Sequence, residues 1–96
     1  MAEYWLSPRA QRDLGKIFDY TVERWGLPQA LRHTDLIATA CADVAEAPER
    51  GHGCADIRPG YRRRSVEQHV IYFRPTSYGI AVIRILHQRM DAARHL

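Results

Sequence analysis

The chain has 96 residues, of which 46% are hydrophobic and 26% are charged, and its formal net charge is +3. These are the proportions of a globular protein, and they exclude a wholly disordered chain or a low-complexity segment. At this length we expect one domain over residues 1–96, with a core small enough for a bound partner to add much of the stability.

The first residues, MAEYWLSPRAQRDL, lack the basic start and the apolar run of a secretory signal, and no 18-residue apolar stretch follows them. We therefore expect a cytoplasmic protein that does not enter a membrane. In that compartment Cys41 and Cys54 should remain thiols. The histidines and cysteines lack the spacing of a zinc site, so the sequence predicts no metal and no other cofactor.

A short β-prone run, Tyr4 to Leu6, precedes Ser7 and Pro8. Serine is a preferred helix N-cap and proline fits the first helical position, so a strand followed by a helix is predicted. Apolar side chains then recur at helical spacing as far as Gly26, which is placed to end the helix. The members of this stripe are Leu14, Ile17, Phe18, Thr21, Val22 and Trp25. We expect this face to pack in the core, Trp25 included.

Pro28 opens a second helical pattern, which Pro48 ends. Its stripe consists of Ala30, Thr34, Ile37, Cys41, Val44 and Ala45. Because only Gly26 and Leu27 separate the two patterns, the helices should fold back on each other as an antiparallel hairpin.

Residues 48–60 contain prolines and glycines without an apolar period, and we interpret them as an irregular loop. Three β-like segments follow at 61–66, 69–74 and 80–86, and they predict a three-stranded antiparallel meander. The expected fold is thus α+β: an N-terminal strand, an antiparallel helical hairpin, the meander in one sheet, and a short C-terminal helical tail. The strand order stays open.

Charge is distributed unevenly along the chain. Residues 1–49 carry 5 basic and 8 acidic side chains, whereas residues 50–96 carry 9 basic and 3 acidic ones, so the two halves have net charges of −3 and +6. With a strand period of two, Arg62 and Arg64 share one face, and we expect Arg84 to face the same way. Tyr72 and Arg74 share one side of the middle strand, and together these five residues predict a recognition surface. A charged edge strand protected from aggregation is the alternative.

Four segments carry a resemblance to a known family: YWLSPRAQRDL, DYTVERWG, RPGYRRRSVEQHVIYFR and GIAVIRILHQRMDAARHL. In this order, over nearly the whole chain, they resemble the ParE toxins of the RelE/ParE superfamily. The fold derived above is similar to the fold of that family. One departure is Glu67-Gln68, where similar toxins often have a glycine-containing turn.

The resemblance implies the toxin of a type II toxin–antitoxin system, with a role in plasmid stabilisation, that inhibits DNA gyrase and blocks replication. It also implies a ParD-like antitoxin whose C-terminal segment wraps the toxin in a hetero-oligomer, and no sequence-specific binding of nucleic acid. An acidic antitoxin tail would be steered to the basic half of the chain. We predict that antitoxin or target is bound by Trp5, Arg62, Arg64, Tyr72, Arg74, Arg84, His87, Arg89 and Met90.

Two other functions stay open. The first is a ribosome-dependent mRNA endonuclease similar to RelE and YoeB, in which His87 would act as acid or base, Glu67 as base, and Arg64 and Arg84 as charge stabilisers. Those nucleases tend to use lysines and a late tyrosine, whereas this chain has one lysine, Lys16, on the wrong face of the first helix, and no tyrosine after Tyr78. A gyrase poison without catalytic residues is therefore favoured. The second is a non-toxic module that only binds the antitoxin. The choice of target among gyrase, topoisomerase IV and the ribosome also stays open.

Overall fold

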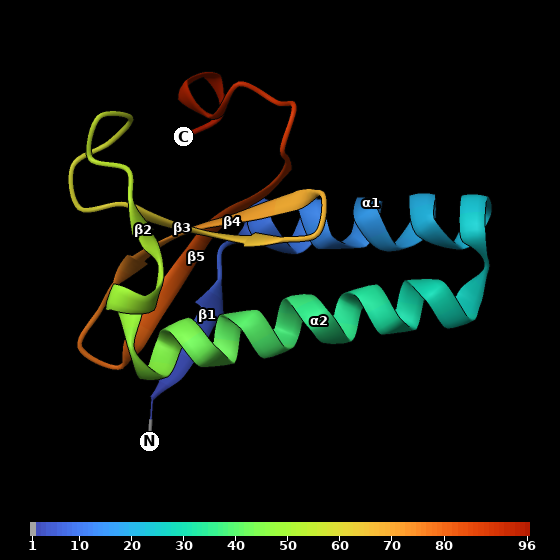
Figure 1. Ribbon diagram of the computed structural model, residues 1–96, viewed down its shortest axis with the longest axis horizontal. Helices are drawn as coiled ribbons and strands as arrows, with labels where there is room; N and C mark the ends of the chain where they lie inside the picture. Colours follow the sequence, from blue (N-terminus) through green and yellow to red (C-terminus); the bar gives the residue numbers. More distant parts are fainter. Residues whose placement is uncertain (1) are drawn as a thin grey trace.

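A computed structural model describes residues 2–96, and its elements follow the predicted order (Figure 1). They are β1 (Glu3–Leu6), α1 (Pro8–Trp25), α2 (Leu27–Glu46), the 3-10 turn η1 (Pro48–Arg50), β2 (His52–Gly53), β3 (Arg62–Val66), β4 (His69–Pro75), β5 (Gly79–His87) and the 3-10 turn η2 (Ala92–Arg94). The predicted strand, helical hairpin and meander are confirmed, and the helical tail is the single turn η2. Across residues 2–96, no helix is long and apolar enough to span a membrane.

The strands form one mixed sheet in the order β1-β5-β4-β3-β2. β1 runs parallel to β5, and the other pairs are antiparallel. β1 approaches β5 very closely at Gly79, where φ is +146° and a Cβ atom, if one were added, would lie 2.0 Å from the carbonyl oxygen of Glu3. The loop expected at 48–60 is less irregular than predicted, because β2 extends the sheet by two residues beside β3.

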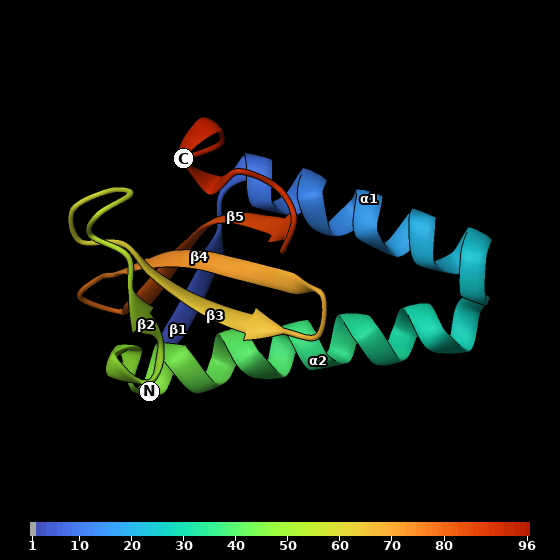
Figure 2. The same cartoon turned by 45° about the horizontal axis from the view of Figure 1, so that its top comes forward.

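The two helices cover one face of the sheet, which we call the helix face, and the C-terminal segment lies on the other, the outer face (Figures 1 and 2). The core on the helix face joins Ile37 and Val44 of α2 to Ile71, Phe73 and Val82 of the sheet. A smaller cluster on the outer face consists of Cys54, Val70, Tyr72, Leu86 and Ala92. Cys41 and Cys54 are both buried, and neither is in a disulfide in the described residues 2–96.

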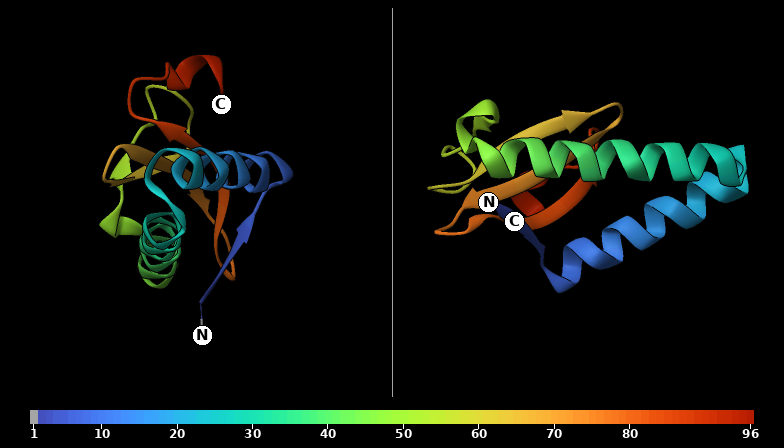
Figure 3. Two further views of the ribbon diagram at one scale, coloured as in Figure 1. Left: turned by 90° about the vertical axis from the view of Figure 1, so that its right-hand side faces the viewer. Right: turned by 90° about the horizontal axis from the view of Figure 1, so that it is seen from below.

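The far end of the helical hairpin extends beyond the sheet (Figures 1 and 3). No strand of the described chain, residues 2–96, lies beneath this end, so its apolar side chains stay in solvent. Trp25 is 67% exposed, and Tyr20, Leu27 and Leu31 are exposed as well. The expectation that Trp25 packs in the core was therefore wrong, because helical periodicity shows which side a residue faces and not whether a second layer reaches it.

β1 covers only the first part of the β5 edge, since its pairing with β5 stops at Leu6 and Val82. Ser7 continues the contact. Its N–H donates to the carbonyl oxygen of Val82 (2.9 Å) and its hydroxyl donates to that of Ile83 (2.7 Å). The same hydroxyl accepts from the N–H of Ala10 (3.0 Å), which makes Ser7 the N-cap of α1, as predicted.

Asp13 of α1 occupies the next stretch of this edge. One of its carboxylate oxygens accepts from the N–H of Ile85 at 3.0 Å. The two oxygens also accept from Arg84, from Nε at 2.8 Å and from Nη2 at 2.9 Å, in a bidentate pair. Arg84 Nη1 donates to the carbonyl oxygen of His95 at 3.3 Å. One guanidinium thus ties together α1, β5 and the C-terminal tail.

Ser7→Ala should lower the free energy of unfolding by about 1 to 2 kcal/mol, because a helix cap is lost and the carbonyl oxygen of Ile83 loses a donor. Urea unfolding followed by circular dichroism measures this loss. Ser65→Ala, at an exposed position of β3, is the control and should change the stability by less than about 0.5 kcal/mol. Equal effects of the two substitutions would contradict the double role of Ser7.

Asp13→Asn should cost more, about 3 kcal/mol, since the Arg84 guanidinium, whose side chain is only 15% exposed, would lose its counter-charge. Asp19→Asn, an exposed position on the same helix, serves as the matched control. The double variant Asp13→Leu with Arg84→Met should lose less stability than either single variant. A double variant as unstable as the sum of the singles would show that the pair does not act as a unit.

Candidate functional site

Arg62 and Arg64 lie on the helix face, where both are bound to nearby groups of the fold. Arg62 donates from Nε to the carbonyl oxygen of Pro48 (3.0 Å) and from Nη2 to that of Gly51 (2.6 Å), and so holds the turn after α2. Arg64 forms an ion pair with Asp43 of α2 at 2.7 Å. Both guanidinium groups therefore attach the helical layer to the sheet.

Arg84 faces the opposite way from these two arginines, which corrects the sequence expectation. Tyr72 pairs with Arg84 and Phe73 pairs with Val82, so Ile83 is an extra residue without a partner in β4. Such a β-bulge reverses the side-chain alternation beyond it. Arg84 thereby shares the outer face with Tyr72, and the single arginine face predicted from a strict period of two does not form.

Two other predicted residues of the outer face, Tyr72 and Arg74, differ in how exposed they are. Tyr72 is only 5% exposed because it belongs to the apolar cluster beneath the C-terminal segment. Arg74 is exposed, and within residues 2–96 it forms no ion pair. Tyr72 is thus part of the fold, whereas Arg74 is available to a partner.

Trp5 and Arg74 lie on either side of one buried alanine. Ala81 of β5 is paired with Trp5 of β1 and with Arg74 of β4, so the three form a row across the sheet. Trp5 is 48% exposed. A shallow cavity of about 480 Å³ adjoins it, lined by Glu3, Tyr4, Trp5 and Tyr78. We call the row the Trp5–Arg74 strip; it combines an indole ring with a guanidinium, two groups that are enriched at protein interfaces.

His87, Arg89 and Met90 lie at the other end of β5. His87 Nδ1 accepts from the backbone N–H of Arg89 at 3.1 Å, and Met90 is 41% exposed. His87 is six residues along the strand from Ala81, about 20 Å at the usual rise. The predicted binding residues therefore fall into two separate surface groups, in the second of which His87 is only partly exposed, and a structural set, and they do not make one continuous surface.

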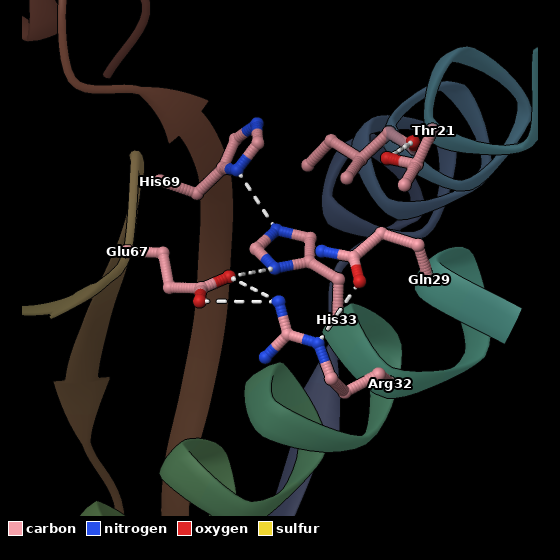
Figure 4. Close-up of polar contacts among 7 residues, drawn as sticks. Thr21, Gln29, Arg32, His33, Glu67 and His69 are labelled. Carbon is pink, nitrogen blue, oxygen red and sulfur yellow. Dashed lines mark hydrogen bonds and ion pairs between the residues drawn. The ribbon is translucent and has the colours of Figure 1, made fainter. Parts of the chain in front are cut away.

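A polar cluster that the sequence analysis missed joins α2 to the turn between β3 and β4 (Figure 4). Glu67 accepts from Arg32 Nη2 at 3.3 Å and contacts His33 Nδ1 at 2.9 Å. His33 Nε2 lies 3.0 Å from His69 Nδ1. His33 is buried, between the stripe residues Ala30 and Ile37 of α2. Its helical spacing was the available signal.

Burial and charge shift the acid–base properties of this cluster. Burial opposes ionisation of Glu67, yet hydrogen bonds from His33 and Arg32 hold the pKa of its carboxyl below the usual value. For His69, burial first, and then the neighbouring His33 and His87, lower the pKa to about 4. His69 is therefore neutral near pH 7.

The four residues considered for a nuclease do not converge. Glu67 and His87 lie at the end of the sheet where the cluster is found, but Arg64 is paired with Asp43 on the helix face and Arg84 is held by Asp13. General acid–base catalysis needs its groups within hydrogen-bond reach of one substrate. In the part of the chain that the structure describes, no group of three His, Cys, Asp or Glu side chains could hold a metal ion.

Comparisons with known proteins agree with the fold. The family model for the ParE toxin of the type II toxin–antitoxin system parDE matches residues 4–92. A protein named Toxin ParE1 from Mycobacterium tuberculosis is 44% identical over 96 residues, which cover 99% of this chain and 98% of the relative. Toxin ParE1 from Caulobacter vibrioides is 38% identical over 96 residues, with 100% and 99% coverage.

A solved structure described as a chromosomal ParDE TA system from P. aeruginosa contains a chain with a TM-score of 0.77 to this protein. The two chains are 25% identical, and the match covers 91% of this chain and 96% of that one. The order of the strands and helices, the family match over nearly the full length and the identity to two ParE1 toxins lead to one conclusion. The chain belongs to the ParE toxin family of type II toxin–antitoxin systems.

Proposed function

We propose that this toxin acts in the cytoplasm on DNA gyrase and that a ParD-like antitoxin neutralises it in a hetero-oligomer. The observation that carries the antitoxin part is the Trp5–Arg74 strip, an exposed aromatic and an unpaired guanidinium on either side of Ala81. The similar chain from P. aeruginosa, which comes from a ParDE system, supports the choice of partner.

The chemistry of the strip fits an acidic segment with apolar side chains. The indole of Trp5 offers a flat apolar surface, and Arg74 can form a bidentate pair with a carboxylate. The +6 charge of residues 50–96 would speed the encounter with such a segment. A disordered antitoxin tail that folds on the strip would gain its affinity from these few anchors.

The candidate nuclease residues lie apart from one another, which favours a toxin that binds its target over one that cleaves it. Because Arg64 and Arg84 each have a carboxylate partner and lie on opposite faces, neither can be withdrawn to stabilise a phosphorane without loss of stability. This favours a gyrase poison over an RNA-cleaving toxin.

Induced expression without an antitoxin should cause filamentation and a DNA-damage response, and the purified protein should inhibit supercoiling by gyrase while cleaved DNA accumulates. A parallel assay with topoisomerase IV tests the choice of target. Ribosome-dependent mRNA cleavage with gyrase unaffected would refute the gyrase proposal. An absence of toxicity together with tight antitoxin binding would leave only the non-toxic module.

Trp5→Ala and Arg74→Ala should each weaken the affinity for the purified antitoxin at least tenfold, because interface anchors of these types contribute about 2 kcal/mol or more. Isothermal titration calorimetry with a purified ParD-like antitoxin measures the affinity. Trp25→Ala is the matched control, since Trp25 is also an exposed tryptophan but lies on the projecting end of the hairpin. A loss in the control alone would place the antitoxin on the hairpin end.

A further inference from the structure

The turn between β3 and β4 is held to α2 by a chain of three side chains. Glu67 contacts His33 at 2.9 Å, and His33 contacts His69 at 3.0 Å, as Figure 4 shows. Glu67 has φ of +53°, a conformation unfavourable for a residue with a side chain. The turn is therefore stabilised in an unfavourable backbone conformation by contacts that depend on protons.

The hydrogen bonds that link Glu67, His33 and His69 can all form when both histidines are neutral. Neutral His33 donates from Nδ1 to Glu67 and accepts at Nε2 from Nδ1–H of neutral His69. One added proton is also accommodated on either ring, because a charged His33 donates at both nitrogens, and a charged His69 donates from Nδ1 to Nε2 of a neutral His33. When both rings are charged, each of the two facing nitrogens carries a hydrogen, and the 3.0 Å contact cannot persist.

We propose that the cluster of Glu67, His33 and His69 is an acid-sensitive latch, which holds the β3–β4 turn against α2 at neutral pH and releases it when acid charges His69 together with His33. Release does not depend on which target the toxin binds. The proposal goes beyond the proposed function, because the opening of the turn is a property of the toxin without any partner.

Of the titratable groups around His69, His33 and His87 disfavour a proton on its ring, and Glu67 favours one. Arg32 of α2 is paired with Glu67 and already supplies one positive charge. His87 of β5 lies edge-on to His69 with ring centroids 5.5 Å apart. From α1, the buried neighbour Thr21 is not titratable, and its hydroxyl donates to its own helix. A proton on His69 would thus add positive charge beside His33 and His87, with Glu67 already paired with Arg32.

The latch also reaches the C-terminal segment. The N–H of Gln88 donates to the carbonyl oxygen of Gln68 in the turn at 2.8 Å, and His69 is paired with His87. Release of the turn from α2 should break this hydrogen bond and expose the Gln88 amide. The exposed residues Arg89 and Met90 follow directly, so acid should loosen this second group of predicted binding residues.

The direction of the pH dependence follows from linkage. The pKa of His69 is about 4 in the fold, below the ordinary histidine value of 6.5 expected once the turn is open, so the open state should bind more protons between these values. The latch should therefore be closed well above pH 6.5 and weaken as the pH falls through 6.5 toward 4. Glu67 stays ionised at about pH 5.5, since its pKa lies below the usual 4.5, so histidine dominates this window.

Hydrogen exchange of the Gln88 amide tests the proposal on the full chain. After correction for the intrinsic rate, the opening equilibrium should rise about tenfold between roughly pH 7.5 and pH 5.5. His69→Gln keeps an N–H donor for His33 but cannot titrate, so its opening should change less than about threefold over the same range. His52→Gln, an exposed histidine on β2, is the matched control and should keep the tenfold change.

A tenfold change that persists in His69→Gln, or one that is absent from the unmodified protein, would overturn the latch. If the variant fails to fold, an NMR titration of the unmodified protein decides. The His69 ring should titrate below about pH 5, and the Gln88 amide shift should follow the same midpoint. A His69 midpoint near 6.5 would show that the fold does not disfavour the proton.

Discussion

The unpaired part of the β5 edge is the constraint on which the rest of this structure depends. β5 lies between β1 and β4, yet β1 accompanies it only as far as Val82. Buried backbone groups must be satisfied, and here Ser7 and Asp13 take the place of the missing strand. Because both side chains belong to the start of α1, the position of that helix is fixed by hydrogen bonds to the sheet as well as by apolar packing. The position of α1 in turn sets that of the helical hairpin, and Arg84 holds the C-terminal tail through its hydrogen bond to His95.

Several of the arginines that make the second half of the sequence basic have structural partners. Arg62 binds carbonyl oxygens, Arg64 binds Asp43, and Arg84 binds Asp13. Each joins two parts of the fold. Recognition is left to a smaller number of exposed groups, of which Trp5 and Arg74 form the clearest pair. A charge-rich strand is thus compatible with a toxin that binds its partners through a few anchors.

The elements themselves could be predicted from the sequence because local signals specify them. Ser7 and Pro8 begin α1, and periodicity places both helices and the meander within one or two residues of their observed bounds. The candidate site was predicted less accurately than the elements, because it depends on contacts between residues far apart in the sequence. The bulge at Ile83 reverses the face of Arg84, and no local signal in an apolar strand marks a bulge. His33 was missed because its partners, Glu67 and His69, are 34 and 36 residues away.

The parallel pairing of β1 with β5 has a consequence for synthesis on the ribosome. The hydroxyl of Ser7 bonds to a residue 76 positions later, so the first strand made must wait for the last. Until residues 79–87 emerge, the nascent chain has its helices and the β3–β4 hairpin but lacks β5, which supplies much of its core. Contacts of such long range form late. An interrupted translation product that ends before Gly79 would therefore be an unfolded substrate for proteases and not a toxin.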